Sequence, residues 1–170
     1  MIISSIKNSI TQNLIVIIFY ILSFGTFEGL KEFTNLLIFS FNLHMIIIYI
    51  YVLKFPNHLG LGHIFLAGII NDVVIGTPLG VSSLSFLILA FFTSYIRNAT
   101  LRPKMSAEWT TFIPALFFSN LVFFVIINNF SHLTFYYAEL LQNTFFTFLF
   151  FPIFNFIFTN FQIKNPGSHA

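Results

Sequence analysis

Residues 109–127 read WTTFIPALFFSNLVFFVII and contain no charged side chain. About 20 mostly apolar residues are needed for a helix to cross the hydrocarbon core of a bilayer. The stretch shows no strict alternation of polar and apolar residues, as a barrel strand would, and lipid allows only helices or closed barrels to span it. We therefore expect residues 109–127 to form a transmembrane helix.

The composition of the whole chain agrees with a lipid environment. Of its 170 residues, 57% are hydrophobic and only 7% are charged, whereas about a quarter of the residues of an average soluble domain are charged. The net charge of +2 does not indicate a nucleic-acid partner, because the lysines and arginines are scattered rather than clustered on one face. Lipid is expected to cover most of the surface.

Five further apolar stretches lie on either side of residues 109–127. We expect spans at about 13–27, 33–53, 59–76, 79–96, 109–127 and 137–161. The predicted fold class is an all-α integral membrane protein with six transmembrane helices, forming a single domain over residues 1–170. The spans 13–27 and 59–76 are short for a bilayer. The first is not read as a signal peptide, because its apolar run continues to Phe27 without a cleavage site of small residues.

The cationic residues predict the orientation. With a cytoplasmic amino terminus, six of the seven fall on the inside and one, Lys31, falls outside. The six inside are Lys7, Lys54, Arg97, Arg102, Lys104 and Lys164. Both termini are therefore expected in the cytoplasm. We also expect an aromatic belt at the inner interface, made by Tyr49, Tyr51, Tyr95 and Trp109.

Asp72 is a charged residue well inside a predicted span. A carboxylate at that depth is costly unless it is paired, so it marks either a functional site or a polar clasp between helices. Gly68 and Gly76 lie four residues before and after it, on the same helical face, where small residues allow a partner helix to approach. Both readings stay open.

The next span continues this pattern of small residues. Its candidate packing face comprises Gly80, Ser83, Leu87, Ala90 and Ser94. The spans 59–76 and 79–96 are therefore expected to pack as a hairpin. Candidate partners of Asp72 at a similar depth are Asn42, His44 and Asn120, and the sequence does not choose among them.

No pattern indicates catalysis, a cofactor or a metal. The chain has no cysteine, and His58 and His63 are five residues apart, which does not place them on one helical face. No serine has a nearby base at a nucleophile spacing. The polar segment 97–108 is expected to contact anionic headgroups, with docking of a cytoplasmic partner as the alternative. Its Glu108 is expected to favour the start of the fifth span.

Three short motifs resemble the rod shape-determining protein MreD family. They are YVLKFP at 51–56, GIIND at 68–72 and GTPLG at 76–80, with Leu84 following. Members of that family commonly carry a basic residue directly before the proline, whereas here Phe55 holds that place and Lys54 precedes it.

The resemblance implies a non-catalytic scaffold of the bacterial elongation machinery in the inner membrane. Its implied partners are MreC, the glycosyltransferase RodA, a class B penicillin-binding protein and, indirectly, MreB, in control of cell shape and peptidoglycan synthesis. It also implies a fold similar to the substrate-binding subunits of energy-coupling-factor transporters, so a transporter-like subunit that binds a small molecule is the alternative. We expect the partner-binding or helix-packing residues to be Asp72, Gly68, Gly76, Pro78, Gly80 and Ser83.

Overall fold

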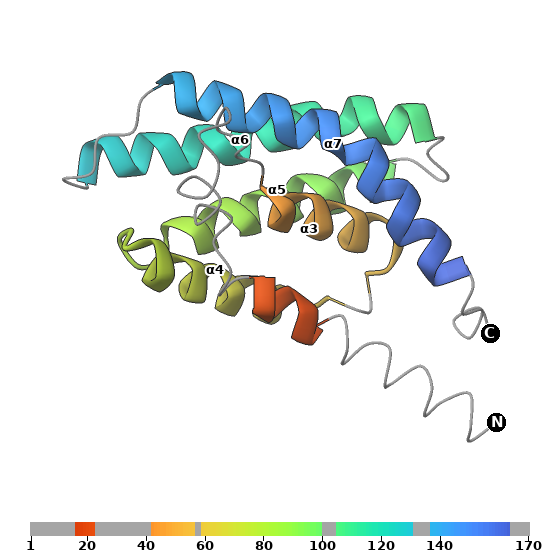
Figure 1. Ribbon diagram of the computed structural model, residues 1–170, viewed down its shortest axis with the longest axis horizontal. Coiled ribbons are helices and arrows are strands. Elements are labelled where there is room, and N and C mark those ends of the chain that lie inside the picture. The colour runs from red at the N-terminus through yellow and green to blue at the C-terminus, as the bar shows by residue number, and fades with distance from the viewer. Residues whose placement is uncertain (1–15, 23–41, 57–58, 100–104, 131–136, 164–170) are drawn as a thin grey trace, which may run out of the picture.

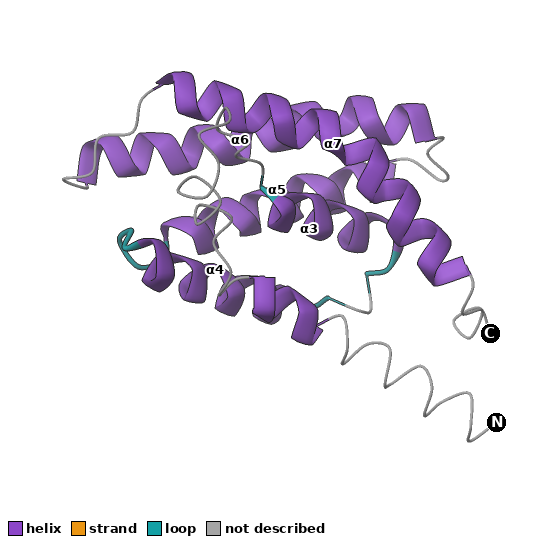
Figure 2. Ribbon diagram, viewed as in Figure 1, coloured by secondary structure: helices purple, strands orange, loops and turns teal. Residues whose placement is uncertain are grey.

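A computed structural model describes residues 16–22, 42–56, 59–99, 105–130 and 137–163 of the chain (Figure 1). Every regular element in these ranges is an α-helix, which confirms the predicted all-α class (Figure 2). A short helical segment covers residues 16–22. The longer helices are α3 (Leu43–Lys54), α4 (Leu61–Ile75), α5 (Val81–Ala99), α6 (Met105–Phe130) and α7 (Tyr137–Ile163).

The helix bounds follow the predicted spans within a few residues. The predicted span 109–127 lies inside α6, which begins four residues earlier and ends three later. A helix is longer than its apolar run because polar residues can continue it into the headgroup region. The beginning of the predicted span 33–53 and most of the span 13–27 lie outside the described residues.

Three of the described helices are long and apolar enough to cross a membrane. The qualifying segments are Val81–Ala99, Ala107–Asn129 and Leu141–Asn160. The helices α3 and α4 are apolar but shorter. The chain is therefore a multi-pass membrane protein by length and composition, and the count of six spans stays a prediction.

The helices form a layered bundle (Figure 1). α3 and α5 lie in the middle, α6 and α7 cover one side, and α4 lies on the other side with the segment 16–22. The carboxyl ends of α3 and α5 and the amino end of α6 lie at one end of the bundle. The turn between α4 and α5 lies at the opposite end.

α3 is the buried centre of this bundle. Every residue from Leu43 to Leu53 is buried, as expected for a helix that is apolar on all sides. The ring of Tyr49 lies 4.8 Å from that of Phe112 in α6 and 5.4 Å from that of Phe151 in α7. Tyr49 and Tyr51 are both buried by neighbouring helices rather than exposed to lipid, and their position at the inner interface stays a prediction.

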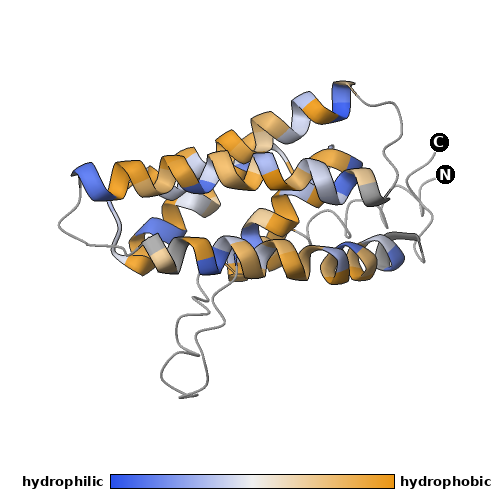
Figure 3. Ribbon diagram, turned by 90° about the horizontal axis from the view of Figure 1, so that it is seen from above, coloured by the Kyte–Doolittle hydropathy of each residue, from blue (hydrophilic) through white to orange (hydrophobic). Residues whose placement is uncertain are grey.

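The outer faces of the bundle are apolar (Figure 3). On α7, Leu141, Phe145, Leu149 and Ile153 are 45 to 63% exposed at intervals of four residues, which places them on one helical face. Water would not stably solvate such a long apolar stripe. This face is therefore suited to contact with lipid chains.

α7 bends toward its carboxyl end, which carries it across the end of α3 (Figure 1). Pro152 lies inside this helix, and a proline removes one backbone hydrogen bond and bends a helix at that point. The bend brings Asn155 and Thr159 to the last turn of α3, where they bond to Lys54.

Candidate functional site

The turn between α4 and α5 is built around two glycines in the left-handed region. α4 ends at Gly76, whose φ is +78°, and Gly80 has a φ of +99°. The backbone nitrogens of Gly76 and Thr77 both donate to the carbonyl oxygen of Asp72, at 2.9 and 3.0 Å. Glycine suits both positions because a side chain is strained at positive φ.

The carboxylate of Asp72 holds the two ends of this turn together. It is fully buried and accepts three hydrogen bonds, from the hydroxyl of Thr77 at 2.8 Å, from the backbone nitrogen of Gly80 at 2.7 Å and from that of Ser82 at 2.9 Å. The first N–H groups of a helix lack partners within the helix, and its positive end favours an anion. Asp72, from the last turn of α4, therefore caps the start of α5.

The two helices of the hairpin approach each other most closely at Gly68. An ideal Cβ on Gly68 would lie 2.5 Å from the backbone nitrogen of Ser83, so no larger residue fits there without moving α5. The hydroxyl of Ser83 donates to the carbonyl oxygen of Phe65 at 2.9 Å, and the side-chain amide of Asn71 donates to the hydroxyl of Ser82 at 3.0 Å. Small and hydroxyl side chains thus join the helices directly.

The six residues predicted as a partner-binding or helix-packing site therefore lie in one hairpin. Pro78 completes the turn by accepting a hydrogen bond from the nitrogen of Val81 at 3.3 Å. Gly76 was expected to let a helix approach, but no heavy atom lies within 4 Å of its Cβ position. Its role is to end α4 at a positive φ.

The expected depth and partners of Asp72 differ from the observed ones. Asp72 lies in the last turn of α4 rather than at its middle, and its three hydrogen-bond donors come from its own hairpin. Asn42 accepts from the nitrogen of Met45 instead, and Asn120 donates to Thr144. The ring of His44 stacks on Phe86, with 5.6 Å between the ring centres.

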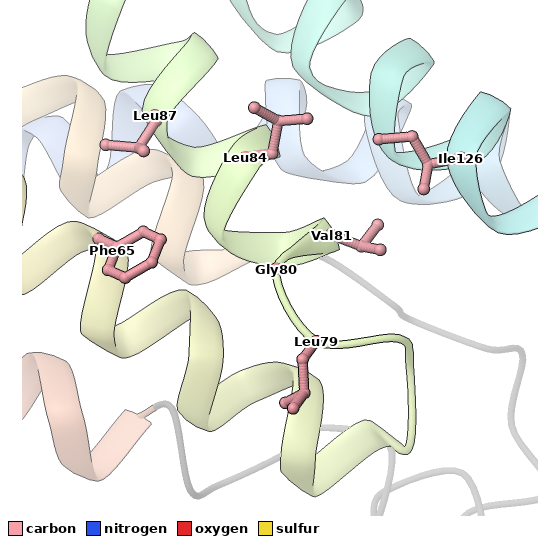
Figure 4. Close-up of a pocket in the computed structure, with 7 residues that line it drawn as sticks. All are labelled: Phe65, Leu79, Gly80, Val81, Leu84, Leu87 and Ile126. Atoms are coloured by element: carbon pink, nitrogen blue, oxygen red, sulfur yellow. The ribbon is translucent and has the colours of Figure 1, made fainter. Parts of the chain in front are cut away.

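An open apolar groove of about 380 Å³ lies beside the hairpin. Figure 4 shows its lining side chains, which come from α4, the turn, α5 and the far part of α6. The lining residues are Phe65, Leu79, Gly80, Val81, Leu84, Leu87 and Ile126. Leu79 at the tip of the turn is 71% exposed, and Leu84 is 44% exposed.

A second polar cluster, which the sequence did not predict, lies at the other end of the bundle. Lys54 in the last turn of α3 contacts Glu108 in the first turn of α6, with 2.9 Å between Nζ and Oε2. The ammonium also donates to Asn155 at 2.9 Å and to Thr159 at 3.2 Å, both in α7. The Asn155 amide donates in turn to Glu108 at 2.9 Å. Three helices therefore share one ion-paired cluster.

Two neighbouring contacts strengthen the same end of the bundle. The hydroxyl of Tyr49 donates to the backbone oxygen of Glu108 at 3.0 Å, and the guanidinium of Arg97 donates to the carbonyl oxygen of Val52 at 2.9 Å. A cation near the last carbonyls of a helix and an acid in the first turn of another both suit the helix dipoles. The sequence predicts the favourable position of Glu108 at the start of a helix. Its pairing with Lys54 depends on how the helices pack.

The described residues contain no group of three or more histidines, cysteines or acids that could hold a metal ion. His63 is hydrogen-bonded to the hydroxyl of Tyr20 at 2.9 Å, and His58 lies outside the described residues.

Fold and site together define a multi-pass helical membrane protein, with a capped hairpin at one end and an ion-paired cluster at the other. The sequence model of one family, described as rod shape-determining protein MreD, matches residues 7–161. The chain belongs to this family, which confirms the resemblance and implies a role in rod shape determination. Comparison with curated proteins and with solved structures finds no match.

Proposed function

We propose that this protein is a non-catalytic scaffold of the elongation machinery in the bacterial inner membrane. In this proposal the groove beside the α4–α5 hairpin binds the single transmembrane segment of an MreC-like partner. RodA and a class B penicillin-binding protein are further candidate partners, and MreB would be linked indirectly.

The observation that carries the proposal is the apolar groove on a rigid hairpin. Its walls are held in place by the three hydrogen bonds of Asp72 and by the close contact of Gly68 with Ser83. Lipid chains remove the hydrophobic driving force between helices, so association in a membrane depends on close van der Waals packing. A preformed groove lined by branched side chains offers such packing to a single helix.

The same geometry revises the role of Asp72 in binding. Its carboxylate is fully buried and bonded within the hairpin, so we assign it to shaping the groove rather than to touching a partner. Leu79 and Leu84 are the exposed lining residues on the turn and on α5, and we expect them to make the contacts.

The transporter-like alternative has less support from this groove. A site for a small polar molecule usually places a few polar groups among apolar walls. The side chains that line this groove are all apolar, and the backbone nitrogen of Gly80 already donates to Asp72. The groove fits a hydrophobic helix better than a vitamin-like ligand.

The test is co-purification of each candidate partner with two matched variants. Leu84→Trp would fill the groove, whereas Leu149→Trp would add the same bulk to the exposed face of α7, away from the groove. We expect Leu84→Trp to reduce recovery of the MreC-like partner by roughly tenfold and Leu149→Trp to leave it unchanged. Equal recovery with both variants would show that the partner does not use the groove.

A further inference from the structure

We infer that this protein thins the bilayer along its α4 edge and selects short lipid chains there. The inference rests on the membrane location alone and does not depend on any protein partner.

The first observation is the length of α4. Its 15 residues span roughly 22 Å at 1.5 Å per residue, whereas the hydrocarbon core of a typical bilayer is about 30 Å thick. Both ends are closed by glycines, Gly60 as the amino-terminal cap and Gly76 as the carboxyl-terminal cap. Tilting the helix would only shorten its projection along the membrane normal, so tilt cannot remove the mismatch.

The second observation is that α4 forms an outer edge of the bundle. α5 lies between α4 and the layer of α6 and α7 (Figure 1). Five large apolar residues of α4 are 39 to 65% exposed. They are Leu61, Phe65, Leu66, Val73 and Val74. The neighbouring segment 16–22, joined to α4 by Tyr20 and His63, belongs to an equally short apolar run that Glu28 ends.

On the opposite edge of the bundle, formed by α6 and α7, the apolar segments are longer than α4. The apolar segments of α6 and α7, Ala107–Asn129 and Leu141–Asn160, contain 23 and 20 residues, which correspond to roughly 34 and 30 Å. They match an undistorted bilayer. One side of the molecule therefore suits thinner hydrocarbon than the other, and lipid must adapt between them.

The third observation concerns the turn at the end of α4. The side chain of Leu79, at its tip, is 71% exposed. Where no partner helix occupies the groove, this side chain suits contact with acyl chains rather than water. Three polar donors of the turn are satisfied internally, since the Thr77 hydroxyl and the Gly80 and Ser82 nitrogens all bond to Asp72. Polar backbone can lie in hydrocarbon only when it is satisfied in this way. These internal bonds and the exposed leucine suit a turn that lies close to the acyl chains.

The test compares the lipid preference at the two edges within the same protein. Trp109 is the one tryptophan of the chain, so Trp109→Phe provides a background without fluorescence from tryptophan. Leu66→Trp places a reporter on α4 and Leu149→Trp places a matched reporter on α7; the two leucines are 51% and 45% exposed. Both lie near the middle of their apolar segments.

Each single-tryptophan protein is reconstituted in mixtures of brominated and unbrominated phosphatidylcholines with chains of about 14 to about 22 carbons. Quenching then gives the relative binding constant of each chain length beside each reporter. We expect the α4 reporter to favour the shorter chains by about two- to threefold and to reach its optimum at a shorter chain than the α7 reporter.

The same optimum at both reporters, or a longer optimum at α4, would overturn the inference. Absence of quenching at Leu66→Trp in every lipid would also overturn it, because lipid chains would then not reach this edge. Val73→Trp, 65% exposed on the same helix and outside the groove lining, repeats the measurement if Leu66→Trp does not insert. The expected difference in lipid preference does not depend on whether Leu84→Trp, the groove variant, loses its partner.

Discussion

The carboxylate of Asp72 accepts a hydrogen bond from the backbone nitrogen of Ser82 at 2.9 Å, across the turn that joins α4 to α5. The bond links the last turn of one helix to the first turn of the next. This bond explains why an acidic residue lies inside an apolar helix. The free N–H groups at the start of α5 need an acceptor where water is scarce.

Replacing Asp72 by alanine should weaken the hairpin. Three donors would lose their acceptor, and we expect a loss of about 2 to 4 kcal/mol in the free energy of unfolding. Membrane level, partner recovery and rod shape should decline together. The measurement is unfolding of the purified protein in detergent beside quantification in the membrane. A stable Asp72→Ala protein that loses only the partner would contradict this and assign Asp72 to direct binding.

Asp72→Asn should have a free energy of unfolding between those of the wild type and Asp72→Ala. An asparagine oxygen can keep the bonds from Thr77 and Ser82, but its amide nitrogen would face the Gly80 nitrogen, which now donates at 2.7 Å. Two donors would then oppose each other, and we expect a cost of about 1 to 2 kcal/mol. The same unfolding assay checks this. A loss equal to that of alanine would mean that charge, not hydrogen bonding, holds the turn.

Gly68→Ala should destabilise the helix pair, because the added carbon would lie against the backbone of Ser83. Overpacking of this kind typically costs about 1 to 3 kcal/mol. Gly62→Ala is the matched control on the same helix, since no atom lies within 4 Å of its Cβ position. It should be neutral or stabilising by up to about 1 kcal/mol, because alanine favours a helix. Equal effects of the two variants would rule out a tight contact at Gly68.

Lys54→Met should destabilise the opposite end of the bundle by about 2 to 4 kcal/mol, because it leaves the buried carboxylate of Glu108 without its cation. The double variant Lys54→Met with Glu108→Leu should recover much of this loss, since no unpaired charge remains. A double-mutant cycle on unfolding free energies should give a coupling of about 1 to 3 kcal/mol. Strictly additive losses would show that the two residues act independently.

The orientation is tested by reporter fusions. A reporter active only in the cytoplasm should work after His169, and one active only outside should work near Ser131, both positions lying outside the described residues. The reason is the cation bias, to which Lys54 and Arg97 contribute from the same end of the bundle. The reverse pattern of activity would exclude a cytoplasmic location for both termini.

The sequence by itself determined the helical class, the approximate helix bounds and the family. Apolar runs such as 109–127 predict helices because lipid leaves the backbone few alternatives. The glycines at 76 and 80 predict a tight turn from backbone freedom alone. Both kinds of inference depend on local properties of the chain, so no tertiary information is required.

Only the tertiary structure decided which polar side chains meet. Asp72 bonds to residues five to ten positions ahead in its own hairpin, and no periodicity distinguishes these from Asn42 or Asn120. Lys54 and Glu108 are 54 positions apart in the chain, and they pair because the ends of α3 and α6 meet where α7 bends over them. Such contacts depend on how the helices rotate and cross, which is set by packing of many side chains at once.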